Sequence, residues 1–254
     1  MFKNPIVAGN WKMNKELLEG VNFVEQIQSK FSKISNVTII FSPPFISLSE
    51  IKVKPPFFKS AQNCFWEEKG AYTGEISTSM IKSCGAEYVI SGHSERREFF
   101  GEIDEVVNNK NKAIFKEKLK PIFCIGETLE QRESRRTKEI LSYQISAGLK
   151  DIDTIDELII AYEPVWAIGT GMTATIEQIE NAHSHIKTDV KELYNIINDV
   201  QVLYGGSVNL NNAQELINVP GVDGFLIGGA SLDVDTFSSI IKIVGDNQEK
   251  KNNG

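Results

Sequence analysis

The sequence predicts an α/β fold, namely a closed barrel of eight parallel strands surrounded by an outer ring of helices. Short runs rich in β-branched and aromatic residues recur along the 254-residue chain, and segments with helical periodicity separate them. Strands that alternate with helices pair in parallel through right-handed crossovers. Eight strands favour closure, because an open sheet would leave two unpaired edges. No linker rich in Pro or Ser interrupts the pattern, so we expect residues 1–254 to form a single domain.

The expected strands share β-branched or aromatic residues. They are residues 6–8, 37–41, 58–61, 88–90, 122–124, 158–162, 201–204 and 224–227.

Two of the intervening segments carry apolar stripes at helical spacing. The stripes are Leu17, Val21, Val24 and Ile27 in the first, and Ile176, Ile179, Ile186, Val190, Leu193 and Ile197 in the second. Ser77 and Thr175 have the side chains and positions of residues that begin helices. The polar residues 245–254, rich in Asn and Lys, predict a frayed, disordered tail.

Composition excludes several classes of function. The chain has 41% apolar and 24% charged residues, a net charge of −7 and a pI near 5.2. These values are typical of a globular protein that binds neither nucleic acid nor an anionic membrane. Cys64, Cys84 and Cys124 are widely spaced and form no CxxC pair, so we expect no disulfide framework and no zinc ribbon. With no leader-like or membrane-spanning segment in the sequence, a reducing, cytoplasmic location is the simplest interpretation.

Residues 161–171 carry the clearest sign of chemistry. A strand-like run ends on Glu163, Pro164 blocks the strand, and an apolar loop punctuated by glycine follows. Loops that stay solvated are usually polar, so we expect this one to be exposed only part of the time. A carboxylate at the edge of a site that can exclude water is suited to act as a strong base. The alternative is a surface glutamate beside a buried turn.

Other chemically useful residues also follow predicted strands. The C-terminal ends of barrel strands face one mouth, which would gather Asn10, Lys12 and His93 beside the carboxylate. Gly205-Gly206 and Gly228-Gly229 follow the last two strands. Glycine pairs let backbone N–H groups approach an anion closely. One pair is usually a tight turn, but two on neighbouring strands predict a phosphate site.

Five runs, taken in order, resemble the triosephosphate isomerase family. They are residues 8–14 (AGNWKMN), 92–97 (GHSERR), 161–171 (AYEPVWAIGTG), 204–208 (YGGSV) and 228–232 (GGASL). The similarity extends from about Pro5 to Val244 without large insertions. It implies a (β/α)8 TIM barrel and an isomerase of glycolysis and gluconeogenesis. That enzyme interconverts dihydroxyacetone phosphate and D-glyceraldehyde 3-phosphate through an enediolate, without cofactor or metal.

The resemblance also implies catalytic roles. Glu163 would be the base that moves a proton between adjacent carbons, its basicity raised by desolvation when a lid closes. His93 would be the electrophile, a neutral imidazole whose pKa is depressed by a helix N-terminus. Lys12 would offset the charge of the phosphate and the enediolate. Asn10 would donate to a substrate oxygen, and Glu95 would orient Lys12.

Binding and closure are implied in the same way. Backbone groups expected at the phosphate, beside Asn10 and Lys12, belong to Gly169, Ser207, Gly228 and Gly229. The expected lid comprises Pro164, Val165, Trp166, Ala167, Ile168, Gly169, Thr170, Gly171, Met172, Thr173 and Ala174. Tyr204 and Ser207 would bond the closed lid, and Glu127 would bind Trp166 in the open one. Met172 and Ser91 depart from the family pattern.

The third loop, residues 62–75, resembles the arm that each subunit of a homodimer inserts into its partner. Thr73, near the tip, would reach the region of Asn10 and Lys12 in the neighbouring subunit. Phe65, Trp66 and Tyr72 fit a buried interface better than a solvated loop.

Two other functions stay open at this stage. One is a Schiff-base aldolase that uses Lys12, which needs a desolvated lysine. The other is a catalytically silent barrel that serves as a binding protein. Cys124 is expected to be a packing residue, and His183 and His185, two apart on a helix, cannot share a metal ion.

Overall fold

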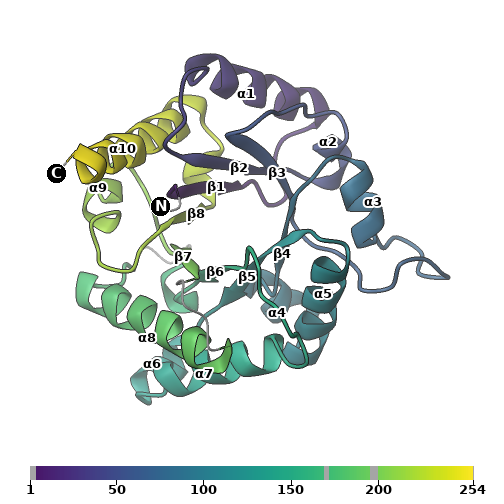
Figure 1. Cartoon of the computed structure of the whole chain (residues 1–254), viewed down its shortest axis with the longest axis vertical. Helices are drawn as coiled ribbons and strands as arrows, with labels where there is room; N and C mark the ends of the chain where they lie inside the picture. The colour runs from purple at the N-terminus through teal and green to yellow at the C-terminus, as the bar shows by residue number, and fades with distance from the viewer. Residues whose placement is uncertain (1–3, 169–171, 195–199, 254) are drawn as a thin grey trace.

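The chain folds around a closed parallel barrel. The computed structural model describes residues 4–168, 172–194 and 200–253. Within them, strands β1 to β8 pair in parallel in chain order, and β8 closes on β1 where Gly224 pairs with Ile6. Figure 1 shows the strands in the middle and the helices around them. The predicted eight-stranded (β/α)8 barrel is confirmed.

Each strand begins and ends within two residues of its predicted segment. The strands are β1 (Ile6–Asn10), β2 (Thr38–Ser42), β3 (Phe57–Ala61), β4 (Tyr88–Ser91), β5 (Lys120–Ile125), β6 (Ile159–Tyr162), β7 (Gln201–Tyr204) and β8 (Gly224–Ile227).

Helices follow most of the strands. They are α1 (Leu17–Lys30), α2 (Phe45–Leu48), α3 (Thr78–Ser83), α4 (Ser94–Phe100), α5 (Asp104–Lys116), α6 (Leu129–Glu133), α7 (Thr137–Gly148), α8 (Ile176–Tyr194), α9 (Ala213–Leu216) and α10 (Val234–Asn253), with 3₁₀ turns η1 (Val165–Ala167) and η2 (Gly229–Ser231).

Both predicted helix starts are confirmed. The Ser77 side chain accepts a hydrogen bond from the Met80 amide at the start of α3. Before α8, the Thr175 hydroxyl accepts from the Gln178 amide at 3.3 Å, and the Gln178 side chain accepts from the Thr175 amide at 2.9 Å. This reciprocal pair satisfies backbone donors that the first helical turn leaves open.

The apolar stripes were predicted only in part. In α1 the buried face includes Gly20 and Phe23, whereas Leu17 is exposed. The Phe23 ring packs edge-on against Trp11, with centroids 5.2 Å apart, so the helix turns that side toward the barrel. In α8 Leu193 is exposed, and Ile197 lies outside the described residues.

The expectation of a frayed tail at residues 245–254 is wrong as far as Asn253, because α10 continues to that residue. Two contacts that sequence spacing does not reveal involve this part of the helix. Asn247 is buried and donates to the Asn218 side chain at 2.5 Å, and the Gly245 carbonyl accepts from Asn36 at 2.9 Å.

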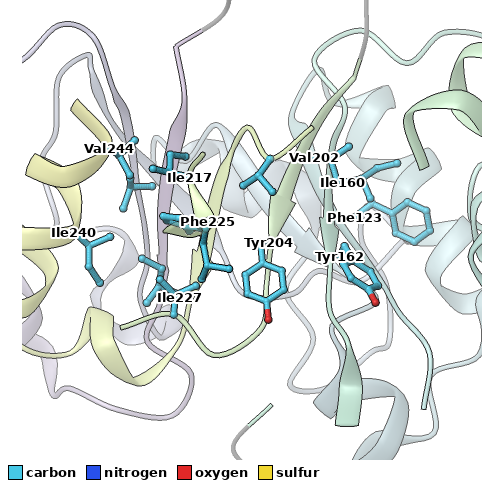
Figure 2. Packing of buried hydrophobic residues seen from close by; sticks show 14 of the residues in the cluster. Phe123, Ile160, Tyr162, Val202, Tyr204, Ile217, Phe225, Ile227, Ile240 and Val244 are labelled. Atoms are coloured by element: carbon cyan, nitrogen blue, oxygen red, sulfur yellow. The ribbon is translucent and has the colours of Figure 1, made fainter. Parts of the chain in front are cut away.

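Alternate residues of each strand enter two different cores. On β6, Ile159 and Ala161 belong to a cluster inside the barrel, whereas Ile160 and Tyr162 belong to the layer between strands and helices. Figure 2 shows that outer layer, where strand residues face the α10 residues Ile240 and Val244. Because side chains alternate along a strand, the residue after Tyr162 continues the inner row at the mouth. That residue is Glu163.

The same alternation applies to the neighbouring strands. Inner residues of β1, β3, β7 and β8 are followed two positions later by residues at the mouth. Those mouth residues are Asn10, Gln62, Gly205 and Gly228. The fold therefore brings the strand ends singled out in the sequence to one place.

Candidate active site

A cavity of about 240 Å³ opens at the C-terminal ends of the strands. Most of the side chains predicted to act on the substrate line it. Its lining includes Asn10, Lys12, His93, Glu163, Ile168, Ser207, Gly228 and Gly229, with Gly205 and Gly206 between them. These residues, which lie far apart in the sequence, therefore line one cavity, as expected.

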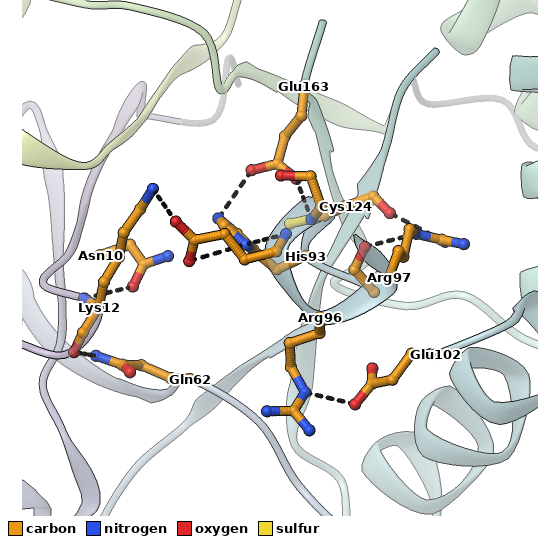
Figure 3. A network of polar contacts seen from close by, with 12 residues as sticks. Asn10, Lys12, Gln62, His93, Arg96, Arg97, Glu102, Cys124 and Glu163 are labelled. Atoms are coloured by element: carbon orange, nitrogen blue, oxygen red, sulfur yellow. Dashed lines mark hydrogen bonds and ion pairs between the residues drawn. The ribbon is translucent and has the colours of Figure 1, made fainter. Parts of the chain in front are cut away.

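Glu163 is held at the cavity wall by two donors. The side chain is 3% exposed. Its Oε2 accepts from the Ser94 backbone N–H at 3.0 Å, and its Oε1 lies 3.1 Å from His93 Nε2 (Figure 3). Ser94 begins α4, so the carboxylate also lies at a helix N-terminus, where negative charge is favoured.

These contacts change the acidity of Glu163 in the opposite direction from burial. Burial raises the pKa of the carboxyl, but His93 and the Ser94 N–H lower it, and the net pKa lies below its ordinary value. The raised basicity expected for a closed site is therefore not a property of this arrangement. It requires the carboxylate to leave His93 and Ser94.

The His93 ring has one donor and one acceptor side. Its Nδ1 accepts from the Glu95 backbone N–H at 3.2 Å, so the proton of the neutral ring sits on Nε2, facing Glu163. Burial lowers the pKa of His93, but the Glu163 carboxylate outweighs it and the net pKa is raised. The expected depression of this pKa by the helix N-terminus is therefore wrong here, because the facing carboxylate favours the charged ring.

Lys12 reaches the cavity from the end of β1. Its ammonium lies 2.6 Å from Glu95 Oε1, as predicted for an orienting carboxylate. Its backbone has φ +54°, a left-handed conformation that L side chains rarely adopt. The Asn10 side chain accepts from the Lys12 N–H at 3.0 Å. Figure 3 shows these residues facing His93 across the site.

Backbone rather than side chains forms the other side of the cavity. Gly205-Gly206 and Gly228-Gly229 both line it. A Cβ built on Gly205 would lie 2.9 Å from Glu163 Cγ, and one on Gly228 would lie 3.3 Å from Lys12 Cε. Glycine at both positions keeps the space between the Glu163 carboxylate and the Lys12 ammonium open.

The structure describes two parts of the expected lid, residues 164–168, which include the turn η1, and residues 172–174. Gly169, Thr170 and Gly171 lie outside the described residues. Glu127 accepts from Trp166 Nε1 at 3.0 Å, the contact expected in the open lid. Tyr204 was expected to bond the closed lid. Burial raises the pKa of its hydroxyl to about 12, against a smaller lowering by the Ala174 backbone.

Thr73 lies away from the cavity, on an exposed loop. This loop, residues 62–75, extends outward before α3 in Figure 1. Phe65 packs against Trp66 and Tyr72, with ring centroids 4.1 and 4.6 Å away. The Tyr72 side chain is still 44% exposed.

The other residues considered have packing roles. Cys124 is fully buried and burial raises its pKa well above the ordinary value, which opposes a nucleophilic role. His183 is buried against Tyr162 and Tyr204, and its pKa falls to about 3. His185 instead contacts Ser142 and Asp189, so the two histidines face different surroundings, as predicted.

Ser91, a departure from the family pattern, has a partner inside the barrel wall. Its hydroxyl donates to Asn111 Oδ1 at 2.6 Å. The hydroxyl is therefore satisfied by a hydrogen-bond partner within the protein.

Two residues near the site were not predicted. Gln62 donates to the Lys12 carbonyl, and Arg132 binds Glu127 at 2.9 Å while its guanidinium lies 4.8 Å from the Trp166 ring centre. The inner-row position of Gln62, two residues after Ser60 on β3, was the available signal for it. No pattern in the sequence pairs Arg132 with Trp166.

Comparisons with known proteins agree with this geometry. The family model for triosephosphate isomerase matches residues 5–244. The triosephosphate isomerase of Geobacter metallireducens is 48% identical over 247 residues, which cover 94% of this chain and 98% of that protein. That of Chloroherpeton thalassium is 46% identical over 249 residues, with coverage of 95% and 99%. The chain belongs to the triosephosphate isomerase family.

Proposed function

We propose that this cavity interconverts dihydroxyacetone phosphate and D-glyceraldehyde 3-phosphate, with Glu163, His93 and Lys12 as its catalytic residues. The observation that carries the assignment is their convergence, with two glycine pairs, on one cavity of about 240 Å³. A carboxylate, an imidazole and an ammonium are the groups that a proton transfer next to a carbonyl needs. The glycine pairs supply backbone N–H groups for the phosphate.

Glu163 takes the proton from the carbon beside the carbonyl. The C–H electron pair then forms the carbon–carbon double bond of the enediolate, and the carbonyl oxygen takes up negative charge. Return of the proton to the neighbouring carbon, together with transfer of the hydroxyl proton from one enediolate oxygen to the other, completes the exchange of ketone and aldehyde. One carboxylate serves both steps because the two carbons are adjacent.

Substrate binding supplies the change in basicity that Glu163 needs. In the free site the Nε2–H of His93 faces Glu163. A substrate carbonyl in the cavity competes for the same proton, and when it wins, Glu163 loses the partner that lowers its pKa. Substrate binding thus breaks the contact between His93 and Glu163 and makes both available to the substrate in one step. Lys12 and Asn10 stabilise the negative charge that forms.

A Schiff-base aldolase is the alternative on the same scaffold. Its lysine must be a neutral amine in order to attack a carbonyl. The Lys12 ammonium instead lies 2.6 Å from the Glu95 carboxylate, an arrangement that suits a fixed positive charge. Borohydride with dihydroxyacetone phosphate should therefore leave no adduct on Lys12, and a trapped adduct would support the aldolase.

The direct test is a coupled assay of the purified chain with D-glyceraldehyde 3-phosphate. Formation of dihydroxyacetone phosphate is followed through an NADH-dependent dehydrogenase that consumes it. We expect turnover without added metal or cofactor. A protein that binds the substrate without converting it would instead be the silent barrel.

The residues 62–75 support a homodimer as a further part of this proposal. Three aromatic side chains pack on one another in a loop that leads away from the barrel, and Tyr72 stays 44% exposed. Met13, next to Lys12, is 96% exposed in the single chain. An arm from a second copy, with Thr73 near its tip, would cover such a surface. Sedimentation of the wild type and of Thr73→Arg tests this, because a monomeric wild type excludes it.

Organisation and location complete the proposal. The barrel takes its strands from the chain between Ile6 and Ile227 and closes on itself, which supports a single domain. No helix among the described residues is long and apolar enough to cross a bilayer. The cysteines are free, which fits the cytoplasmic location expected from the sequence.

A further inference from the structure

The side chain of Gln62 ties three strand ends together. Gln62 is half-buried and directly follows β3. Its Nε2 donates to the Lys12 carbonyl at 2.8 Å and to the Ser42 carbonyl at 2.9 Å. Lys12 follows β1 and Ser42 ends β2. An amide nitrogen has two protons, so both are committed to these two backbone oxygens. Figure 3 shows the bond to Lys12.

The residue that Gln62 holds is in an unfavourable backbone conformation. Lys12 has φ +54°, where its Cβ crowds the backbone. Such a conformation persists only when surrounding contacts fix it. The Asn10 side chain accepts from the Lys12 N–H at 3.0 Å, and Gln62 donates to the Lys12 carbonyl. Side chains therefore hold the backbone of Lys12 on both sides.

The conformation of this backbone decides where the ammonium goes. From it, the Lys12 side chain lines the cavity, with Nζ 2.6 Å from Glu95. A backbone relaxed to negative φ would direct the Cα–Cβ bond elsewhere. We propose that Gln62 is a positioning residue, which keeps Lys12 in the left-handed conformation and so aims its ammonium at the substrate phosphate. This inference rests on the proposed role of Lys12.

The test is a double-mutant cycle with Gln62→Met and Lys12→Ala. Methionine keeps the length of Gln62 but removes both donors without adding charge. We expect Gln62→Met to lower kcat/KM about ten-fold, mainly through KM, and to weaken inhibition by inorganic phosphate in parallel. In the Lys12→Ala background, Gln62→Met should lower kcat/KM by less than about two-fold, because the effects of two residues that act through one another are not additive.

Gln144→Met is the matched control. Gln144 also holds backbone with its amide, since its Oε1 accepts from the Gly126 N–H at 2.8 Å and its Nε2 donates to the Gly126 carbonyl at 3.1 Å. It does not touch Lys12. Any fold-loss in kcat/KM caused by Gln144→Met should therefore multiply with the fold-loss caused by Lys12→Ala. Sedimentation and thermal unfolding of all variants separate a kinetic effect from a change in assembly or fold.

The outcomes distinguish this inference from the proposed function. If Lys12→Ala has normal kinetics, the role of Lys12 fails. If Lys12→Ala is impaired but the fold-losses in kcat/KM of Gln62→Met and Lys12→Ala multiply in the double mutant, Gln62 does not position Lys12. The same holds if Gln62→Met changes only the assembly of the protein. Should Gln62→Met fail to fold, Gln62→Glu decides the matter: protonation restores one O–H donor, so its kcat/KM relative to wild type should rise as pH falls. A constant ratio overturns the inference.

Discussion

The two sides of the cavity are built from different materials. On the base side, Glu163 and His93 are charged or titratable side chains only 3% and 6% exposed, and each faces the other. On the side proposed for the phosphate, the groups besides the Lys12 ammonium are neutral backbone of Gly205-Gly206 and Gly228-Gly229, which are half-buried or exposed. Buried side chains can change their proton affinity when a partner leaves, whereas backbone N–H groups cannot. The difference separates the proposed base from the groups proposed to bind the phosphate.

Removing the base should produce the largest effect. Glu163→Gln keeps the size of the side chain but leaves no carboxylate to take the proton. We expect kcat to fall on the order of 10²–10⁴-fold, the range for loss of a positioned general base, with little change in KM. Steady-state assays in both directions measure this. Near-normal turnover would exclude Glu163 as the base.

His93→Gln should have the next largest effect. The glutamine amide can also donate hydrogen bonds, but it does not reproduce the Nε2–H that the Glu95 N–H fixes through Nδ1. We expect kcat to fall about 10²-fold, the size of effect seen when one donor to a developing oxyanion is lost. An increase in KM alone would instead assign His93 to substrate binding. It would then contradict the contrast between a reacting side and a binding side of the cavity.

Gly229→Ala examines the phosphate side with little disturbance of the fold. A Cβ on Gly229 would meet no atom within 4 Å, so the melting temperature should not change. In the complex that Cβ would occupy space beside the anion, and we expect KM to rise about ten-fold while kcat changes little. The inhibition constant of inorganic phosphate should rise in parallel. Unchanged constants would move the phosphate away from Gly229.

Gly228→Ala is the informative comparison for that prediction. Its Cβ would lie 3.3 Å from Lys12 Cε, so it should disturb the ammonium as well as the anion. A larger loss of kcat in Gly228→Ala than in Gly229→Ala is therefore expected.

The sequence predicted what depends on local pattern. Strand positions follow from runs of β-branched residues, and the barrel brings each strand end to the mouth, so Glu163 and the glycine pairs could be placed without coordinates. The left-handed backbone of Lys12 and its tie to Gln62 could not, because the two residues lie 50 positions apart. The acidity of His93 was misjudged for a similar reason. The helix N-terminus is visible in the sequence, but the carboxylate that faces the ring comes from β6.

The folded part of the tail was missed for a further reason. Asn is a weak helix former on its own, although Lys is a good one, and the helical residues after Gly245 make contacts such as that of Asn247 with Asn218. Such contacts join residues that are distant in the sequence.

The smallest effect we predict concerns stability, and it sharpens the contrast between titratable and neutral sides. The Glu163 pKa is lowered on folding from 4.5, so its contribution is complete above that pH and is lost as pH falls through the folded value. The His93 pKa is raised from 6.5, so its contribution is complete below that pH and is lost as pH rises through the folded value. The gap in melting temperature between wild type and Glu163→Gln should therefore be widest between about pH 4.5 and 6.5. A gap of a few degrees is expected, since ~1 kcal/mol shifts Tm by about 2–4 °C in a chain of this size. Gly229→Ala, which removes no charge, should track the wild type at every pH, and a flat gap for Glu163→Gln would mean that the pair is not coupled on folding.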